Sequence, residues 1–289
     1  MFFCNQINLG CHWSHGKTLH DTIHSAYCNG CYTPQIFMGT PYSPTRKKYS
    51  DGDIAATNEL LQQTGQNVFT HLPYVYNLAG SAKKNRLAFD GDDEVTSYTL
   101  KCCESIGQEI QTLDKLHCYK KGCVLHIGSS GDPRGLKTVA ASINAINLSN
   151  SCPLLLETMV GRGNVLGKTF EELRQVYEAV EDKEGVGFCI DTCHIFSQGL
   201  YRMHDEADID RLFEDMDRVL GRKKIGLVHL NDSSKNFKSC KDRHALVARG
   251  MIWGSRRKPL KYLIKRFTDW DVPLVLETAE SDLKVVHAL

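Results

Sequence analysis

Eight short apolar segments recur along the chain, and they constrain its fold more than any other feature. They are near-continuous apolar runs rather than alternating ones, which is typical of parallel strands covered by helices. Their sequences are NQINLG (5–10, the weakest), TPQIFMG (33–39), NVFTHL (67–72), GCVLHIG (122–128), PLLLET (153–158), GVGFCID (185–191), IGLVHLN (225–231) and VPLVLET (272–278). Because helical patterns separate most of them, the sequence predicts an α/β fold, a (β/α)8 TIM barrel.

Amphipathic patterns fill most of the intervals between these segments. In residues 169–185 a threonine precedes acidic residues, as at many helix starts, and apolar residues then gather on one face. Residues 205–221 repeat the pattern and end at Gly221, which suits a helix C-cap. Only eleven residues follow Thr278, so the last helix must be short.

No low-complexity linker divides the 289 residues. We therefore expect one barrel catalytic domain over residues 1–289, with its active site at the carboxyl ends of the strands. Residues 81–93 make one connection longer than the barrel needs, which predicts a loop insertion that is either an ordered DNA-contacting loop or a mobile segment. No apolar run approaches the ~20 residues that cross a bilayer, and the first residues lack a secretory signal. We expect a cytoplasmic or nuclear protein with reduced cysteines.

Six of the eight predicted strands end in a histidine or a carboxylate. These residues are His71, His126, Glu157, Asp191, His229 and Glu277. The carboxyl ends of barrel strands meet at one rim, so the six side chains should gather there. Three further candidates follow in nearby loops, namely His194, Asp242 and His244.

These residues have a simpler explanation if they are taken one at a time. Asp191 could accept backbone hydrogen bonds at a helix N-terminus, and a lone strand-end histidine is more often structural than a ligand. Six such ends together are hard to explain in this way, because clustered carboxylates repel one another unless cations neutralise them. Imidazoles mixed with carboxylates favour zinc, and nine ligands suit two or three ions.

The charge of the chain is unevenly distributed, although its net value is only +1. Residues 171–220 hold 14 acidic and 5 basic side chains, whereas residues 222–266 hold 14 basic and two acidic ones. Such runs are usually solvated faces, but this basic stretch also contains the densest group of candidate ligands. The combination predicts that a polyanion meets a reactive centre, and it favours hydrolysis of a nucleic-acid phosphodiester.

Several longer motifs resemble the endonuclease IV family of apurinic/apyrimidinic endonucleases. They include FCIDTCHIFSQG, LLLETMVGRGNVLG, VLHIGSS and, most specifically, VHLNDSSKNFKSCKDRHALVARGMIWG, in which DRH follows HLND. THLPYVYNLAG, QIFMGTP and GCHWSHGKTLHDTIHSA extend the likeness over nearly the whole chain. The resemblance implies a zinc-dependent TIM barrel that cuts DNA 5′ to an abasic site, leaving a 3′-hydroxyl and a 5′-deoxyribose phosphate. It also implies removal of 3′-blocking groups.

The resemblance further implies three zinc ions per chain, with Glu157 bridging two of them at the catalytic centre. The ligands would divide into three sets, which are His71, His126 and Glu157; Glu157, Asp191, His229 and Glu277; and His194, Asp242 and His244.

The implied partner is double-stranded DNA that contains abasic sites, and we expect a monomer. Tyr74 matches a family position that fills the gap left by the missing base, although it could simply pack on the rim. His12 matches a DNA-contacting position. Arg162 could bind phosphate or cap a helix. In the basic stretch, Lys235, Lys238 and Arg249 are candidate phosphate contacts, and Arg249 stands where the family commonly has an acid.

Two other functions remain possible on the same barrel. A sugar isomerase or epimerase would use two divalent ions and would have no use for a third ligand set or a basic stretch. A non-catalytic DNA-binding relative would be expected to have lost ligands, yet all nine are present.

The cysteines suggest no further metal site. Cys28 and Cys31 have C-x2-C spacing without a second pair, so they should be reduced thiols or a redox-sensitive pair. Cys102 and Cys103 fit a helix core, and Cys193 should point away from Asp191 and His194.

Overall fold

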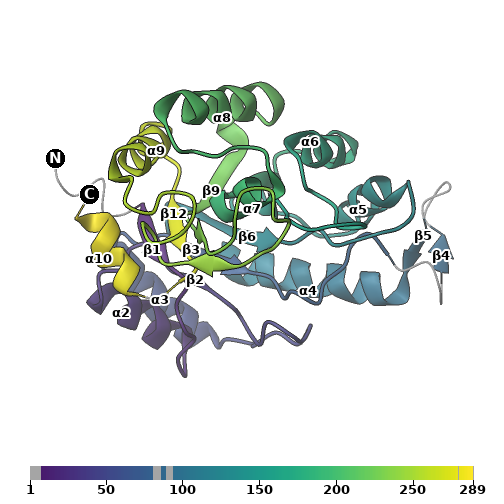
Figure 1. The fold of residues 1–289 in the computed structure, drawn as a ribbon. Helices are drawn as coiled ribbons and strands as arrows, with labels where there is room; N and C mark the ends of the chain where they lie inside the picture. The colour runs from purple at the N-terminus through teal and green to yellow at the C-terminus, as the bar shows by residue number, and fades with distance from the viewer. Residues whose placement is uncertain (1–7, 81–85, 89–93, 279, 289) are drawn as a thin grey trace.

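The computed structural model describes residues 8–80, 86–88, 94–278 and 280–288 (Figure 1). Eight parallel strands form the predicted barrel in the order β1-β12-β9-β8-β7-β6-β3-β2. Their bounds are β1 Leu9–Cys11, β2 Gln35–Ile36, β3 Val68–His71, β6 Lys121–Leu125, β7 Leu154–Glu157, β8 Val186–Asp191, β9 Ile225–His229 and β12 Leu274–Leu276. A parallel bridge between His12 and Gln35 joins β1 to β2, so the sheet nearly closes on itself.

Helices cover the outside of the strands (Figure 1). They are α2 Leu19–Cys28, α3 Asp51–Thr64, α4 Ser97–Asp114, α5 Gly135–Asn144, α6 Phe170–Ala179, α7 Thr192–Gln198, α8 Glu206–Val219, α9 Arg257–Asp269 and the short α10 Ser281–His287, with a 3-10 turn η1 at Arg222–Lys224. The Thr169 hydroxyl accepts from the Glu172 N–H at 3.2 Å, which confirms the predicted start of α6. Leu220 is the C-cap of α8, and Gly221 lies one residue later with φ 81°.

Two apolar layers follow from the alternation of side chains along each strand. The larger layer lies between the strands and the helices, and its buried members include Ile190 and Phe213. The smaller layer fills the barrel interior with one side chain from each of six strands, namely Phe69, Val124, Leu155, Cys189, Leu227 and Val275. The next inward position on each of these strands is two residues further toward its carboxyl end.

Two short pairs of strands lie outside the barrel. β4 Arg86–Ala88 pairs antiparallel with β5 Glu94–Thr96, while the rest of the predicted insertion at 81–93 lies outside the described residues. β10 Asp232–Ser233 pairs antiparallel with β11 His244–Ala245 after β9. Among the described residues, no helix has the length and apolar character needed to cross a membrane.

The cysteines of the described residues are free thiols. Cys28 is exposed at the end of α2 and lies beside His24, whereas Cys31 is buried with its Sγ atom 3.9 Å from that of Cys11. The two thiols of the C-x2-C motif therefore have different neighbours. Cys102 and Cys103 are buried in α4, as expected for core packing.

Candidate metal centre

The period of two along the strands explains how the candidate ligands reach one place. Each of the six strand-end candidates stands two residues after a member of the interior apolar layer, so its side chain points into the barrel mouth. The interior residue and the candidate ligand that follows it are, strand by strand, Phe69 and His71, Val124 and His126, Leu155 and Glu157, Cys189 and Asp191, Leu227 and His229, and Val275 and Glu277. The sequence prediction that these residues share one rim is therefore matched by their placement.

The first group consists of His71, His126 and Glu157, whose donor atoms lie within 4.8 Å of one another. Glu157 Oε2 lies 2.9 Å from His126 Nε2 and 3.4 Å from His71 Nε2. The other ring nitrogen of His71 lies 2.7 Å from the Leu72 carbonyl and donates to it. This bond leaves Nε2 free to face the carboxylate.

The second group shares Glu157 and adds Asp191, His229 and Glu277 within the same 4.8 Å limit. His229 Nδ1 lies 3.1 Å from Glu157 Oε1, 3.3 Å from Glu277 Oε2 and 3.9 Å from Asp191 Oδ2. Glu157 thus uses its two oxygens toward two different groups. This is the placement that a bridging carboxylate needs.

The third group consists of His194, Asp242 and His244. Asp242 lies 3.3 Å from His194 Nε2 through Oδ2 and 3.1 Å from His244 Nε2 through Oδ1. His194 Nδ1 lies 2.7 Å from the Thr158 carbonyl, to which it donates, so its Nε2 points toward Asp242. The Asp242 side chain is 47% exposed, which makes this group the one most open to solvent.

Two buried atoms of the centre have no hydrogen-bond partner of acceptable geometry among the described residues. They are Glu157 Oε2 and His194 Nε2. Buried polar atoms are normally paired, so these two atoms call for a partner, and a bound cation would supply one. Nitrogen and carboxylate donors in groups of three and four match the ligands that zinc prefers. The residues therefore fit a metal cluster.

The electrostatics of the site favour bound cations. Burial would raise the pKa of Glu157, but the positive charges of His126 and His229 outweigh it and hold that pKa well below its ordinary value. Burial would likewise raise the pKa of Glu277, but the positive charge of His229 outweighs burial and lowers that pKa to about 2. Burial would lower the pKa of His244, yet its hydrogen bond to Asp242 and the charge of Asp191 raise it to about 9. The buried carboxylates of the centre therefore need positive charge close by, which bound cations would supply.

Two of the predicted DNA-contacting residues, Tyr74 and His12, lie beside the candidate ligands at the mouth of this centre. Tyr74 is 43% exposed, and its ring centroid lies 5.0 Å from that of His71 and 5.4 Å from that of His126. His12 is half-buried with its ring against Phe37, at 4.7 Å between centroids. Tyr74 and six of the candidate ligands line a cavity of about 280 Å³.

The predicted basic contacts are exposed on loops of the rim. Lys235 and Lys238 lie between β10 and β11, the segment that also carries Asp242, and Arg249 follows β11. Arg162 is exposed in the loop after β7, and the next helix is capped by Thr169, so Arg162 does not cap it.

The prediction that Cys193 points away from the candidate ligands is wrong. Its Sγ atom lies within 4.8 Å of donor atoms of Asp191 and His244. The reason is that Cys193 lies in the first turn of α7 rather than continuing the strand, so side-chain alternation no longer applies. The buried thiol lies 3.9 Å from the Arg243 carbonyl and 3.8 Å from the Ser197 hydroxyl.

Sequence reasoning missed three residues at the centre. Gln35 is a fully buried polar residue on β2, and Asn231 donates to Asp191 Oδ2 at 2.8 Å and to Glu277 Oε2 at 2.9 Å. Tyr42 is 75% exposed and its ring centroid lies 6.2 Å from that of Tyr74. A glutamine inside an apolar strand segment was a usable signal for the first. Nothing in the spacing of Tyr42 indicated its neighbour.

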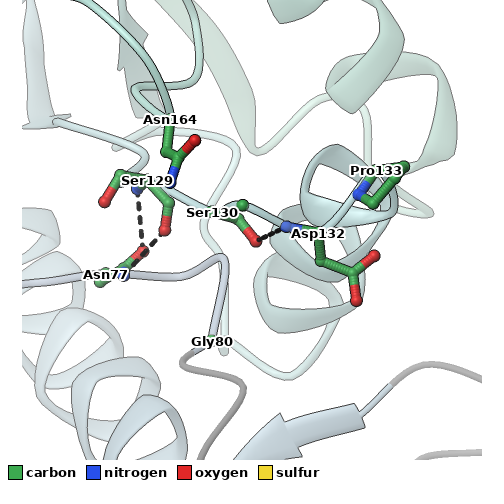
Figure 2. A pocket seen from close by; sticks show the side chains of 8 residues that line it. Asn77, Gly80, Ser129, Ser130, Asp132, Pro133 and Asn164 are labelled. Atoms are coloured by element: carbon green, nitrogen blue, oxygen red, sulfur yellow. Dashed lines mark hydrogen bonds between the residues drawn. The ribbon is translucent and has the colours of Figure 1, made fainter.

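A second cavity, of about 590 Å³, lies on the rim (Figure 2). The loops that form it follow β3, β6 and β7, the three strands that carry the first group. Asn77 holds two of these loops together, since its side chain accepts from the Ser129 N–H and donates to the Ser129 carbonyl, both at 3.1 Å (Figure 2). Asp132 is the one charged residue among those that line the cavity. The cavity therefore extends the polar surface beside the first group.

Comparisons with known proteins agree with this architecture. Residues 29–287 match the family described as xylose isomerase-like TIM barrel. A protein of Staphylococcus carnosus named "Probable endonuclease 4" is 31% identical, over 91% of this chain and 83% of that protein. A protein of the same name from Clostridium botulinum is 31% identical over 85% and 84% of the two chains.

Solved structures show a similar fold. Endonuclease IV from Thermus thermophilus has a TM-score of 0.78 at 23% identity, covering 97% of this chain and 98% of that one. A D-tagatose 3-epimerase-like protein has a TM-score of 0.68 at 15% identity, covering 97% and 96%. Since both proteins share the barrel, the fold alone does not separate a nuclease from an epimerase.

Proposed function

This chain belongs to the endonuclease IV family of xylose isomerase-like TIM barrels, and we propose that it is a zinc-dependent apurinic/apyrimidinic endonuclease. Its substrate is double-stranded DNA with an abasic site. It hydrolyses the phosphodiester 5′ to the lesion, leaves a 3′-hydroxyl and a 5′-deoxyribose phosphate, and removes 3′-blocking groups. We further propose that residues 1–289 act as one catalytic domain and as a monomer.

One observation carries this proposal, namely that nine candidate nitrogen and oxygen ligands fall into three groups on one rim. A fourth group among the described residues, Asp191, Cys193 and His244, takes two of its members from the same nine. His71, His126 and Glu157 would hold one zinc, and Glu157 would also serve a second together with Asp191, His229 and Glu277. His194, Asp242 and His244 would hold the third. When bound, such ions activate a water as nucleophile and neutralise charge on the phosphoryl oxygens.

The third group distinguishes this proposal from a sugar epimerase. A neutral polyol builds up less negative charge than a phosphodiester during its reaction, so two ions are enough for it. The third group is also the most open to solvent, where a DNA phosphate can approach, and its Asp242 lies on the loop that carries Lys235 and Lys238.

Metal analysis together with a nicking assay tests the proposed function. We expect close to three zinc ions per purified chain, because three ligand groups are present, and incision of a duplex with one abasic site. Brief treatment with a chelator should leave much of the activity. An intact duplex is the control substrate. One ion or none in folded, active protein would contradict the trinuclear assignment, and epimerisation of a sugar without nicking would favour the alternative.

Neutralising Lys235, Lys238 and Arg249 together should weaken DNA binding and flatten its salt dependence. Each lost phosphate contact should reduce the slope of log K against log salt by about 0.9. Cleavage at saturating DNA should change little, since none of the three is a ligand. A matched variant at the opposite end of the barrel, with Lys115, Arg222 and Lys223 neutralised, should keep the wild-type slope. An equal slope in both variants would place the basic loop away from the DNA.

Replacing Tyr74 with alanine should reduce discrimination between abasic and intact duplex. The expected loss is roughly 1–3 kcal/mol, the contribution of one stacked base. The half-exposed ring stands at the mouth of the centre, where it can occupy the gap left by a missing base. Binding of both duplexes would be measured at fixed salt, with zinc content as a check. Tyr119→Ala is the control, because Tyr119 is 81% exposed just before β6, at the opposite rim. Equal loss of affinity for both duplexes would indicate that Tyr74 only packs.

A further inference from the structure

Gln35 is a polar residue at the seam where the barrel closes. Its side chain is fully buried on β2, and its backbone carbonyl oxygen accepts from the Trp13 N–H at 2.8 Å. A parallel bridge joins it to His12 on the β1 side, and a ladder pair joins it to Phe69 on β3. The backbone is thus held from both sides, so the amide at the end of the side chain starts from a well-defined position.

The amide of Gln35 contacts two of the candidate ligands. Its Oε1 atom accepts from His229 Nε2 at 2.8 Å, and its Nε2 atom donates to Glu277 Oε1 at 3.3 Å. His229 and Glu277 come from adjacent strands, β9 and β12. The Nε2 atom of Gln35 also lies 3.4 Å from His12 Nδ1.

Only one orientation of this amide satisfies both neighbours. The carboxylate of Glu277 can only accept, so the NH2 group must face it and the carbonyl oxygen must face the imidazole. In a metal-bound centre the neutral imidazole would then carry its single proton on Nε2, and the lone pair of Nδ1 would be free for the ion that Glu157, Glu277 and Asp191 surround. A reversed amide would favour the tautomer that blocks this nitrogen.

We infer that Gln35 is a positioning residue for the second metal ion. It selects the tautomer of His229 whose Nδ1 atom can bind metal, and it holds Glu277 by Oε1. Asn231 contacts the other oxygen of Glu277 at 2.9 Å, so the carboxylate is held from two sides. This inference rests on the proposed function, because it concerns ligands of the proposed zinc cluster.

The test compares two fully buried glutamines. Gln66 donates to the Cys31 carbonyl at 3.0 Å and to the Ile23 carbonyl at 3.4 Å, and it belongs to none of the candidate metal groups. We would prepare Gln35→Met and Gln66→Met. For each we would measure zinc affinity by competition with a chelator and thermal unfolding of the metal-free protein.

Loss of an outer hydrogen-bond partner of a ligand typically weakens metal binding 10–100-fold. Gln35→Met should therefore bind one zinc about 10–100-fold more weakly, while Gln66→Met should keep wild-type affinity even if it unfolds at a lower temperature.

A second variant and a spectroscopic readout keep the test decisive if Gln35→Met folds poorly. Gln35→Asn keeps the amide but withdraws it by one methylene, so it too should weaken zinc binding. In the zinc-loaded wild type, nitrogen NMR should show the His229 proton on Nε2, and its protection from exchange should fall in both Gln35 variants. If both variants kept wild-type zinc affinity and an equally protected proton, this inference would be overturned, while the proposed function would still stand. A wild-type protein that binds no zinc would overturn the proposed function together with it.

Discussion

Replacing Glu157 with glutamine should remove most of the bound zinc and lower abasic-site nicking by at least ~10²-fold, the lower end of the loss from one electrostatic contact. Glu157 is fully buried, and its two oxygens face different ligand groups, with His126 Nε2 at 2.9 Å and His229 Nδ1 at 3.1 Å. Glutamine has the same shape but no charge, and its NH2 end cannot bind a cation. Two ions would therefore lose a shared ligand at once.

The control for this variant is another buried glutamate. Glu109 on α4 is 1% exposed and pairs with Arg46 at 3.4 Å. Glu109→Gln leaves the Arg46 charge without its partner, so it should destabilise the fold, by about 3–5 kcal/mol in typical buried pairs. It should keep its zinc and its turnover at temperatures where it stays folded. Normal zinc content and nicking in Glu157→Gln would disprove the bridging role.

The double variant Asp242→Asn with His244→Ala should lose about one zinc and lower turnover by roughly 10²–10³-fold or more. Asp242 lies on the loop after β10 and His244 begins β11, and with His194 they form the group most open to solvent. An ion there contributes only if negative charge builds up beyond what two ions can neutralise. That condition holds for a phosphoryl group and its departing oxygen.

The other properties of this double variant should change little. Neither residue belongs to the barrel core, so the unfolding temperature of the metal-free protein and most of the DNA affinity should remain. The measurements are zinc per chain, single-turnover nicking and duplex binding. A full metal complement with near-normal nicking would mean that the loop is structural. The third ligand group would then no longer argue against an epimerase.

The fold could be predicted from the sequence because its signals are local. The eight apolar segments correspond to the eight barrel strands, and the weakest, NQINLG at 5–10, overlaps β1 Leu9–Cys11 at its last two residues, while residues 5–7 lie outside the described part of the chain. Boundaries were less predictable, since apolar residues continue beyond the hydrogen-bonded ladder. The segment at 33–39 contains a strand of only two residues, and α8 ends before the predicted Gly221. Residues 81–93 lie largely outside the described part of the chain, so the predicted insertion remains a prediction.

The sequence by itself determined which side chains reach the rim. Strand residues two positions apart share a face, so a histidine or carboxylate two residues beyond a buried apolar residue must enter the barrel mouth. This rule places His71, Glu157 and their counterparts on the other strands without any knowledge of tertiary contacts. The period of two ends where the strand ends, and this is why the orientation of Cys193, on the first turn of α7, was predicted wrongly.

The tertiary structure alone decided which of these side chains meet and through which atoms. Gln35 and His229 are 194 residues apart, and their contact exists because β2 and β9 face each other across the barrel interior. Likewise, Tyr42 comes beside Tyr74 only through the packing of two rim loops. Spacing along a strand specifies a direction for each side chain, but the distance between side chains of different strands depends on barrel closure. Closure is a property of all eight strands together, so no single segment of the sequence encodes it.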